Sequence, residues 1–262
     1  GTGALSAGGV SYPDLGGGSF NYCEPTLSVG QALLDFNDCD IFGNGNATVT
    51  IGDSAQASPV LLGSLGGNTV VGGYGVSLLA GSTDEAATQL GYFAKAGGEA
   101  ATGAIGVGVK AGGLNLTSGT GEGAYTQIGH GGNGSFDGNH HDADVTIVFC
   151  EPGDLSLLAG EDDAYAQIGH GGFGVLGDFG GNLTIIGHDT DTAVGTLTMA
   201  GGENSAYAQI GHGGRDSSGV LEGDIVIAAN AIDLDGGNST AAYSQIGHGG
   251  FQSDTSDDGA IS

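Results

Sequence analysis

The sequence has almost no positive charge. Lys95, Lys110 and Arg215 are its only lysine and arginine residues, against 30 Asp and Glu, which gives a formal net charge of −27. Nucleic acids and anionic lipid surfaces are bound through lysine and arginine, so we expect neither as a partner. Cations, or a basic surface on another protein, are the partners that this charge favours.

Long apolar runs are also absent. No run approaches the roughly 18 residues that a helix needs to cross a bilayer, so we expect no insertion into a membrane. The first residues do not read as a secretory signal peptide, which needs a basic region followed by an apolar one. Either such a segment has been removed or the sequence is part of a longer chain.

Cysteine is scarce, with 3 residues, and tryptophan is absent. Three cysteines are too few for a scaffold built on disulfide bonds. Cys23 and Cys39 could close a short loop and leave Cys150 unpaired. The alternative is that all three are small buried side chains.

Glycine, in contrast, supplies 58 of the 262 residues. It follows no G-x-y period, so a collagen-like fold is excluded and many tight turns or disorder remain. Short β-branched runs such as DVTIV (144–148) and DIVIA (224–228) recur between the glycine clusters, which argues against disorder. These features predict an all-β fold.

One nine-residue motif occurs four times at intervals of about 40 residues. Such a period is typical of repeat architectures. A weaker relative, ATQLGYFA, lies at 87–94. The full copies are AYTQIGHGG at 124–132, AYAQIGHGG at 164–172, AYAQIGHGG at 206–214 and AYSQIGHGG at 242–250.

Each repeat follows one plan: a variable polar loop after GHGG, two short strands, and the motif as a third strand. About three strands per repeat, joined by glycine bends, predict one coil of a parallel β-helix, with about six or seven coils in all. A β-propeller blade would need four strands. The expected first strands are 144–149, 182–187 and 224–229, the second strands are 154–160, 196–202 and 231–237, and the loops are 133–143, 173–181 and 215–223.

Equivalent residues of stacked coils should form ladders at about 4.8 Å. We expect the isoleucines inside and the tyrosines and glutamines outside, with each Gln amide bonded to its neighbours, although the opposite side assignment stays open. The histidines would lie in the bends. The ladders are Tyr125, Tyr165, Tyr207 and Tyr243; Gln127, Gln167, Gln209 and Gln245; Ile128, Ile168, Ile210 and Ile246; and His130, His170, His212 and His248.

The motif AYAQIGHGG, with GDI-V-I and L-L-AGG strands between its copies, resembles the repeats of filamentous-haemagglutinin-like bacterial exoproteins. The resemblance covers 124–250 most specifically. It implies a right-handed parallel β-helix (β-solenoid), a secreted or cell-surface location, and a role as a fibrous stalk or adhesin. It brings no catalytic residues. We therefore expect an extracellular structural or adhesive solenoid, either a segment of a fibrous adhesin or a subunit of a surface filament.

We expect a single domain, 1–262, that both enters and leaves in the middle of a coil. Its open ends would expose unpaired strands, which favour association. Partners are then further copies stacked head to tail, with GAIS (259–262) completing the coil begun by GALSAGG (3–9), or the continuation of a longer chain. A ligand on a host or neighbouring cell is a further candidate. The subdivisions are divergent N-terminal coils (1–59), degenerate repeats (60–123), regular repeats (124–250) and the start of a further coil (251–262).

Two kinds of side chain could bind metal ions, although no cofactor is required. His140 and His141 lie beside Asp142 and Asp144, and imidazoles suit transition metals. The histidine ladder is a weaker candidate, because its straight stack does not converge on one ion. Acidic loops could hold Ca²⁺, although solvated charge is the simpler interpretation. The acidic candidates are Asp162, Asp163, Asp189 and Asp191.

We expect the protein not to be an enzyme. The sequence has no nucleophile elbow, phosphate loop or HExxH motif, and glycoside hydrolysis needs two carboxylates facing one bond. The alternatives are a β-helical polysaccharide-active enzyme and a calcium-stabilised carbohydrate-binding module. Ice binding would need threonine arrays, but the pairs at 48–50 and 196–198 do not recur in every coil.

Overall fold

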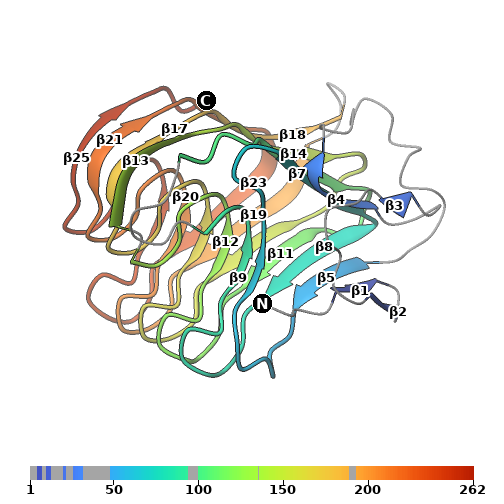
Figure 1. Cartoon of the computed structure of the whole chain (residues 1–262), viewed down its shortest axis with the longest axis horizontal. Helices are drawn as coiled ribbons and strands as arrows, with labels where there is room; N and C mark the ends of the chain where they lie inside the picture. The colour runs from blue at the N-terminus through green and yellow to red at the C-terminus, as the bar shows by residue number, and fades with distance from the viewer. Residues whose placement is uncertain are drawn as a thin grey trace.

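A computed structural model describes residues 48–93, 100–134, 136–188 and 193–262, together with four short strands before residue 48. Every regular element in these residues is a β-strand, and no helix there is long and apolar enough to cross a membrane. The strands wind into stacked coils whose neighbours pair in parallel, so the predicted β-solenoid is confirmed (Figure 1).

Four sheets run along the solenoid, numbered here in the order in which the chain visits them. Sheet 1 contains β3 (Phe20–Asn21), β4 (Thr26–Gln31), β7 (Asn68–Gly73), β10 (Ile105–Val109), β14 (Val145–Phe149), β18 (Leu183–Gly187) and β22 (Ile225–Ile227). Sheet 2 contains β1 (Leu5–Ala7), β2 (Val10–Tyr12), β5 (Thr48–Gly52), β8 (Gly75–Leu79), β11 (Leu114–Thr117), β15 (Leu155–Leu158), β19 (Val194–Ala200) and β23 (Ala229–Asp235).

Sheet 3 is built from the repeated motif. Its strands are β6 (Val60–Leu62), β9 (Thr88–Leu90), β12 (Thr126–Ile128), β16 (Ala166–Ile168), β20 (Ala208–Ile210) and β24 (Ser244–Ile246). These six strands stack over about five turns, fewer than the six or seven coils predicted. Sheet 4 contains β13 (Phe136–Asp142), β17 (Leu176–Gly180), β21 (Ser218–Glu222) and β25 (Asp254–Asp258).

Sheet 4 corrects the sequence-based description of each coil. The segments 133–143, 173–181 and 215–223, expected to be variable loops, contain β13, β17 and β21, so the regular coils have a fourth strand. Their sequences show no clear alternation of apolar and polar residues, which is why they read as loops. The first and second strands of the regular coils lie where the sequence predicted them, and each end differs from the predicted one by two residues or fewer.

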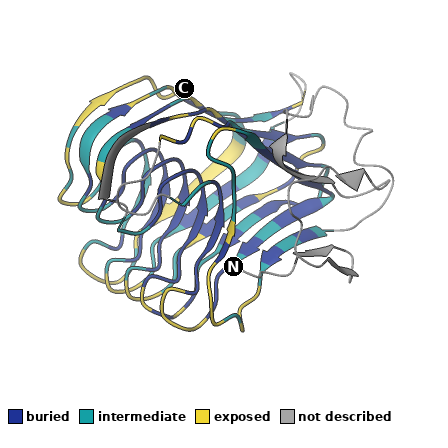
Figure 2. Ribbon diagram, in the orientation of Figure 1, coloured by how far each residue is buried: buried dark blue, intermediate teal, exposed yellow. Residues whose placement is uncertain are grey.

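The main core lies between sheets 1, 2 and 3. Apolar side chains at equivalent positions stack through it, such as Val107, Ile147 and Ile185 in sheet 1, all of which are fully buried. The isoleucine ladder lies in this core as predicted, with Ile128, Ile168 and Ile210 fully buried and Ile246 packed against its edge. Figure 2 shows the buried strands inside and exposed residues at the corners and last coil.

A second buried layer lies on the other side of sheet 3 and corrects the expected outer position of Tyr and Gln. These side chains do point away from the main core, but Gln167 and Tyr165 are fully buried. Phe173, just after the motif, packs on the tyrosines, and Gln167 donates to the carbonyl oxygen of His170. The GHGG segment therefore folds back over the outer face of the strand that precedes it.

The N-terminal strands pair differently from the coils. Within residues 1–59, β5 pairs in parallel with β8, whereas β1 and β4 pair antiparallel with β5 and β7. β2 and β3 add further antiparallel strands outside them. Because β1 is paired on both sides, the GALSAGG segment does not offer a free parallel edge to a GAIS strand. The edge strands β2 and β3 have only three and two residues, and very short edge strands reduce edge-to-edge aggregation.

Candidate functional site

The histidine ladder closes each coil and joins it to the next. His170 Nε2 lies 2.6 Å from the carbonyl oxygen of Ala143, where the same coil enters sheet 1. Its Nδ1 accepts a hydrogen bond of 2.9 Å from the backbone N–H of His130 in the preceding coil. Successive rings are stacked, with centroids 4.9 Å apart. Equivalent Nε2 contacts of 2.8 Å join His130 to Gly103, His212 to Gly181 and His248 to Gly223.

These contacts fix the protonation of the rings. Nδ1 must accept and Nε2 must donate, so the imidazole is neutral with its proton on Nε2. Burial lowers the pKa of His130 to about 4 and that of His212 to about 3, each partly opposed by the backbone carbonyl it contacts. Burial and the neighbouring imidazoles hold the pKa of His170 well below its usual value. Both nitrogens are occupied, so the ladder offers no lone pair to a metal ion.

The glutamine ladder bonds to main chain rather than to itself, which corrects the expected amide-to-amide pattern. Gln167 Nε2 donates to Gly211 O at 2.9 Å and to Gly213 O at 2.8 Å, both in the next coil. Its Oε1 accepts from the hydroxyl of Tyr207 at 3.4 Å. Gln127 and Gln209 make the same contacts one coil before and one coil after. Each glutamine thus ties the glycine bend of the next coil to its own coil; Gly213 O also accepts from Gly172 N, so the amide is its second donor.

The tyrosine ladder is a continuous stack of rings. Centroids of successive rings lie 4.6 to 5.0 Å apart, with 4° to 6° between planes, from Tyr125 to Tyr243. Tyr165 Oη donates to Gln127 Oε1 at 3.0 Å. Burial raises the pKa of Tyr165 well above its ordinary value, so the phenol remains a donor. Side chains from three motif positions therefore form one buried network that spans the regular coils.

Replacing Tyr165 with phenylalanine tests this network. The change keeps the ring stack but leaves the buried Oε1 of Gln127 without its donor, so we expect a loss of about 1–3 kcal/mol in unfolding free energy. Tyr243→Phe is the matched control, because its 3.4 Å contact to Gln209 is longer and only partly buried. Urea denaturation of both variants gives the comparison, and equal losses would contradict the buried-network explanation.

Acidic residues gather where the chain turns from sheet 2 into sheet 3. We call these turns the acidic corner; they comprise residues 83–86, 121–124, 161–164 and 203–206. Several of them hold non-glycine residues with positive φ, among them Glu85 at 58° and Asp163 at 62°. Asp162 Oδ1 accepts from Asn204 Nδ2 at 2.7 Å, which links two neighbouring turns.

Arg215 neutralises part of this corner. Its Nη1 donates to Asp163 Oδ1 at 2.7 Å, and its guanidinium lies 4.7 Å from the ring centroid of Phe173. Its Nε lies 3.1 Å from Asp216 Oδ2, an ion pair without hydrogen-bond geometry. Burial raises the pKa of Asp163, and Arg215 opposes that rise.

Arg215→Leu is expected to lower the unfolding free energy by about 1–2 kcal/mol, because Asp163 loses its partner while half-buried. Adding Asp163→Asn should restore part of the loss, since no charge then remains unpaired. Thermal melts of the single and double variants measure this. A double variant less stable than Arg215→Leu alone would refute the ion-pair interpretation.

The predicted metal candidates whose side chains the structure describes are not brought together. His141 is buried, stacks on Phe179 at 5.5 Å and accepts a hydrogen bond from Ala101 N, whereas Asp142 and Asp144 are exposed. For His140 the structure gives only the backbone, in β13. Asp162 and Asp163 have the protein partners named above, and Asp189 and Asp191 lie outside the described residues. Among the described residues, no three His, Cys, Asp or Glu side chains form a group that could hold a metal ion.

Cys150 forms a disulfide bond, so the expectation that it is unpaired is wrong. The other two cysteines, Cys23 and Cys39, lie outside the described residues. The shared Cys-Glu-Pro sequence at 23–25 and 150–152 could not reveal the pairing, because spacing alone does not fix disulfide connectivity.

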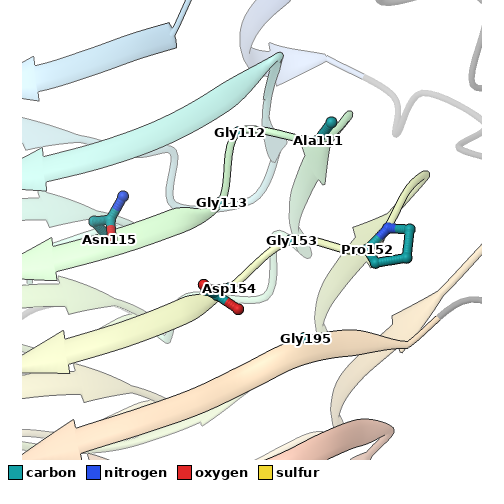
Figure 3. Close-up of a pocket in the computed structure, with 8 residues that line it drawn as sticks. All are labelled: Ala111, Gly112, Gly113, Asn115, Pro152, Gly153, Asp154 and Gly195. Atoms are coloured by element: carbon teal, nitrogen blue, oxygen red, sulfur yellow. The ribbon is translucent and has the colours of Figure 1, made fainter.

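A shallow groove of about 430 Å³ crosses the turn between sheets 1 and 2 (Figure 3). Glycines on successive turns form its floor, including Gly113, Gly153 and Gly195. Asp154 is the one ionisable side chain on its lining, and its Oδ1 accepts from Thr196 N at 2.8 Å. Asn115 Oδ1 accepts from Ser156 Oγ. The groove thus lacks the carboxylate pair of a glycoside hydrolase.

The outer face of sheet 2 carries a mixed polar column. Register places Thr50, Ser77, Asn115, Ser156 and Thr198 beside one another in successive strands. The threonines are separated by serine and asparagine, so the face is not the regular threonine array that ice binding would require.

Comparison with known proteins gave no significant match to any family model, curated protein or solved structure.

Proposed function

We propose that the chain is an extracellular structural and adhesive β-solenoid, a segment of a fibrous adhesin or a subunit of a surface filament. The observation that carries this proposal is the buried network of Tyr, Gln and His. It joins every regular coil to the next through side chains as well as through sheets, as a stiff rod requires. We propose no catalytic role. The one groove described above has a single carboxylate, which supports that proposal.

Two observations support an extracellular location. Cys150 is disulfide-bonded, and disulfides persist mainly in oxidising compartments. The chain contains only 3 lysines and arginines in 262 residues, so trypsin-like proteases have few sites to cut. The large negative charge also keeps a rod with exposed loops soluble. A ligand on a host or neighbouring cell would then meet sheet 4 and the acidic corner, which face outward.

The last coil supports association at one end. β23 is largely exposed, and Ile232, Leu234 and Ile261 are 52, 45 and 60 % exposed. Gln245 Nε2 donates only to His248 O among the described residues, whereas the preceding glutamines also bond to glycine carbonyls of a next coil. We propose that a further coil pairs with this edge, from the same polypeptide or from a second copy. The antiparallel strands at the other end favour continuation of the polypeptide.

Two experiments test the proposed function. Electron microscopy of the purified chain should show short rods if the edge is continued in one polypeptide, and filaments of indefinite length if copies stack. Antibodies to residues 173–181 should label intact producing cells without permeabilisation. Labelling only after permeabilisation, or turnover of acidic polysaccharides that Asp154→Asn abolishes, would contradict the proposal.

A further inference from the structure

The tyrosine ladder ends at the coil of β12, two strands before the end of sheet 3, since neither β9 nor β6 carries a tyrosine at this position. β9 pairs in register with β12, with Thr88 beside Thr126, so Ala87 takes the position that Tyr125 has in the next coil. Ala87 packs against Tyr125 in the same buried cluster. Leu61, beside Gln89, likewise takes the position of the ladder glutamine. The ring is therefore missing in β9, which still carries the ladder glutamine Gln89, and the amide is missing one strand further, in β6.

A hollow of about 280 Å³ opens where that ring is missing. Its apolar wall includes Leu61, Ala87, Phe93 and Tyr125. Leu61 is 38 % exposed, so it lies on the open side of the hollow. Tyr125 is only 3 % exposed, so it forms the inner end of the hollow. In the regular coils the equivalent space is filled by the next tyrosine ring.

The opening of the hollow is acidic. Glu85 lines it and is exposed, and Asn133 adds a side-chain amide. Asp84 and Glu122 belong to the same pair of turns, joined by a hydrogen bond of 3.1 Å from Glu122 N to Asp84 Oδ1. Lys110 and Arg215, the two lysine and arginine residues that the structure describes, belong to other turns. A guest entering here would meet negative charge at the opening and an apolar, aromatic wall inside.

We propose that this hollow binds a small aromatic cation: a flat ring of the size of a tyrosine side chain, carrying an ammonium group. The ring continues the tyrosine ladder beyond Tyr125, where neighbouring rings elsewhere lie 4.6 to 5.0 Å apart. The ammonium pairs with Glu85 at the opening. This binding site is independent of the proposed role as a rod, and either proposal can fail without the other.

Tyramine, a phenol ring with an ammonium on a two-carbon chain, is the probe. We expect saturable binding to one site with millimolar affinity, as befits a ligand of about ten non-hydrogen atoms. Isothermal titration gives the affinity. NMR gives the location, because nuclear Overhauser effects should connect the ring protons with the methyl groups of Leu61. 4-Hydroxyphenylacetate, with the same ring and a carboxylate, should bind at least tenfold more weakly.

Ala87→Tyr is the decisive variant, because it fills the hollow with the residue that the motif carries in four other coils. It should fold and should bind tyramine at least tenfold more weakly. Glu85→Gln should weaken binding about threefold or more, whereas Glu203→Gln, an exposed carboxylate three coils away, should not change it. Undiminished binding by a folded Ala87→Tyr variant, equal binding of the carboxylate analogue, or absence of contacts to Leu61 would each overturn the proposal.

Discussion

Replacing Gly169 with alanine is expected to lower the unfolding free energy by about 2–6 kcal/mol. Gly169 has φ +140°, and a Cβ there would lie 2.0 Å from the carbonyl oxygen of Gly211 in the next coil. Backbone strain of about 1–3 kcal/mol adds to a similar cost for overpacking. Because the obstructing atom is main chain, relief requires the two coils to separate.

Gly174→Ala is the matched control for this prediction. Gly174 also has a positive φ, +63°, but a Cβ there would have no atom within 4 Å. Its replacement should therefore lower the unfolding free energy by about 1–2 kcal/mol, the cost of placing alanine in the left-handed backbone conformation. Thermal and urea melts of both variants separate the two contributions. If Gly169→Ala and Gly174→Ala lowered the stability equally, the explanation that Gly169 is needed for the close approach of neighbouring coils would be wrong.

Acidification from pH 7.5 to 5.5 is expected to remove about 4 kcal/mol of stability. The pKa values of the three fully buried ladder histidines are lowered in the folded protein. Their imidazoles therefore stay neutral over this pH interval. They are His130, His170 and His212. In the unfolded chain each has a pKa near 6.5 and takes up a proton. Since the unfolded state then binds more protons, stability falls with falling pH, by about 1.4 kcal/mol per histidine over this interval.

The sign and window of this effect distinguish it from the effect of the carboxylates. The penalty begins near pH 6.5 and grows until the folded pKa values, about 4 for His130 and about 3 for His212, are reached. Carboxylates ordinarily titrate near pH 4, so repulsion among the acidic residues changes little between pH 7.5 and 5.5.

Urea midpoints at the two pH values measure the histidine effect. His170→Gln should be less stable at pH 7.5 yet show a pH dependence about one third smaller. Midpoints that do not move between these pH values would show that the ladder histidines are not neutral and buried as described.

The sequence was sufficient to predict the fold, because a period near 40 and alternation within each strand both follow from stacking. It also predicted that Ile128 and its equivalents face the core. It could not show that the outer side of the motif strand is covered. The alternation of residue types along the motif strand shows which side chains share a face. Whether the residues after the strand fold back over its outer face depends on the backbone bend from Gly169 to Gly172, which the alternation does not reveal.

The histidine contacts were beyond sequence reasoning for a similar reason. The carbonyls that meet the rings belong to three glycines and one alanine, Gly103, Ala143, Gly181 and Gly223. Small residues do not stand out in a sequence with 58 glycines. The hollow, in contrast, could have been predicted from the sequence. Alignment of ATQLGYFA with the full motif places Ala87 where the other coils have tyrosine, so the missing ring could have been read from the repeat itself.

Two hydrogen bonds of the motif point toward the coil that follows. His130 N and Gln127 Nε2 donate to groups of the next coil, whereas Tyr165 Oη donates to Gln127 of the coil before it, so each coil presents donors for which its successor supplies the acceptors. During synthesis the N-terminal coils leave the ribosome first, so each later coil would meet the donors of a coil that is already formed. The coils would then form one after another, each pairing with the coil that was completed before it.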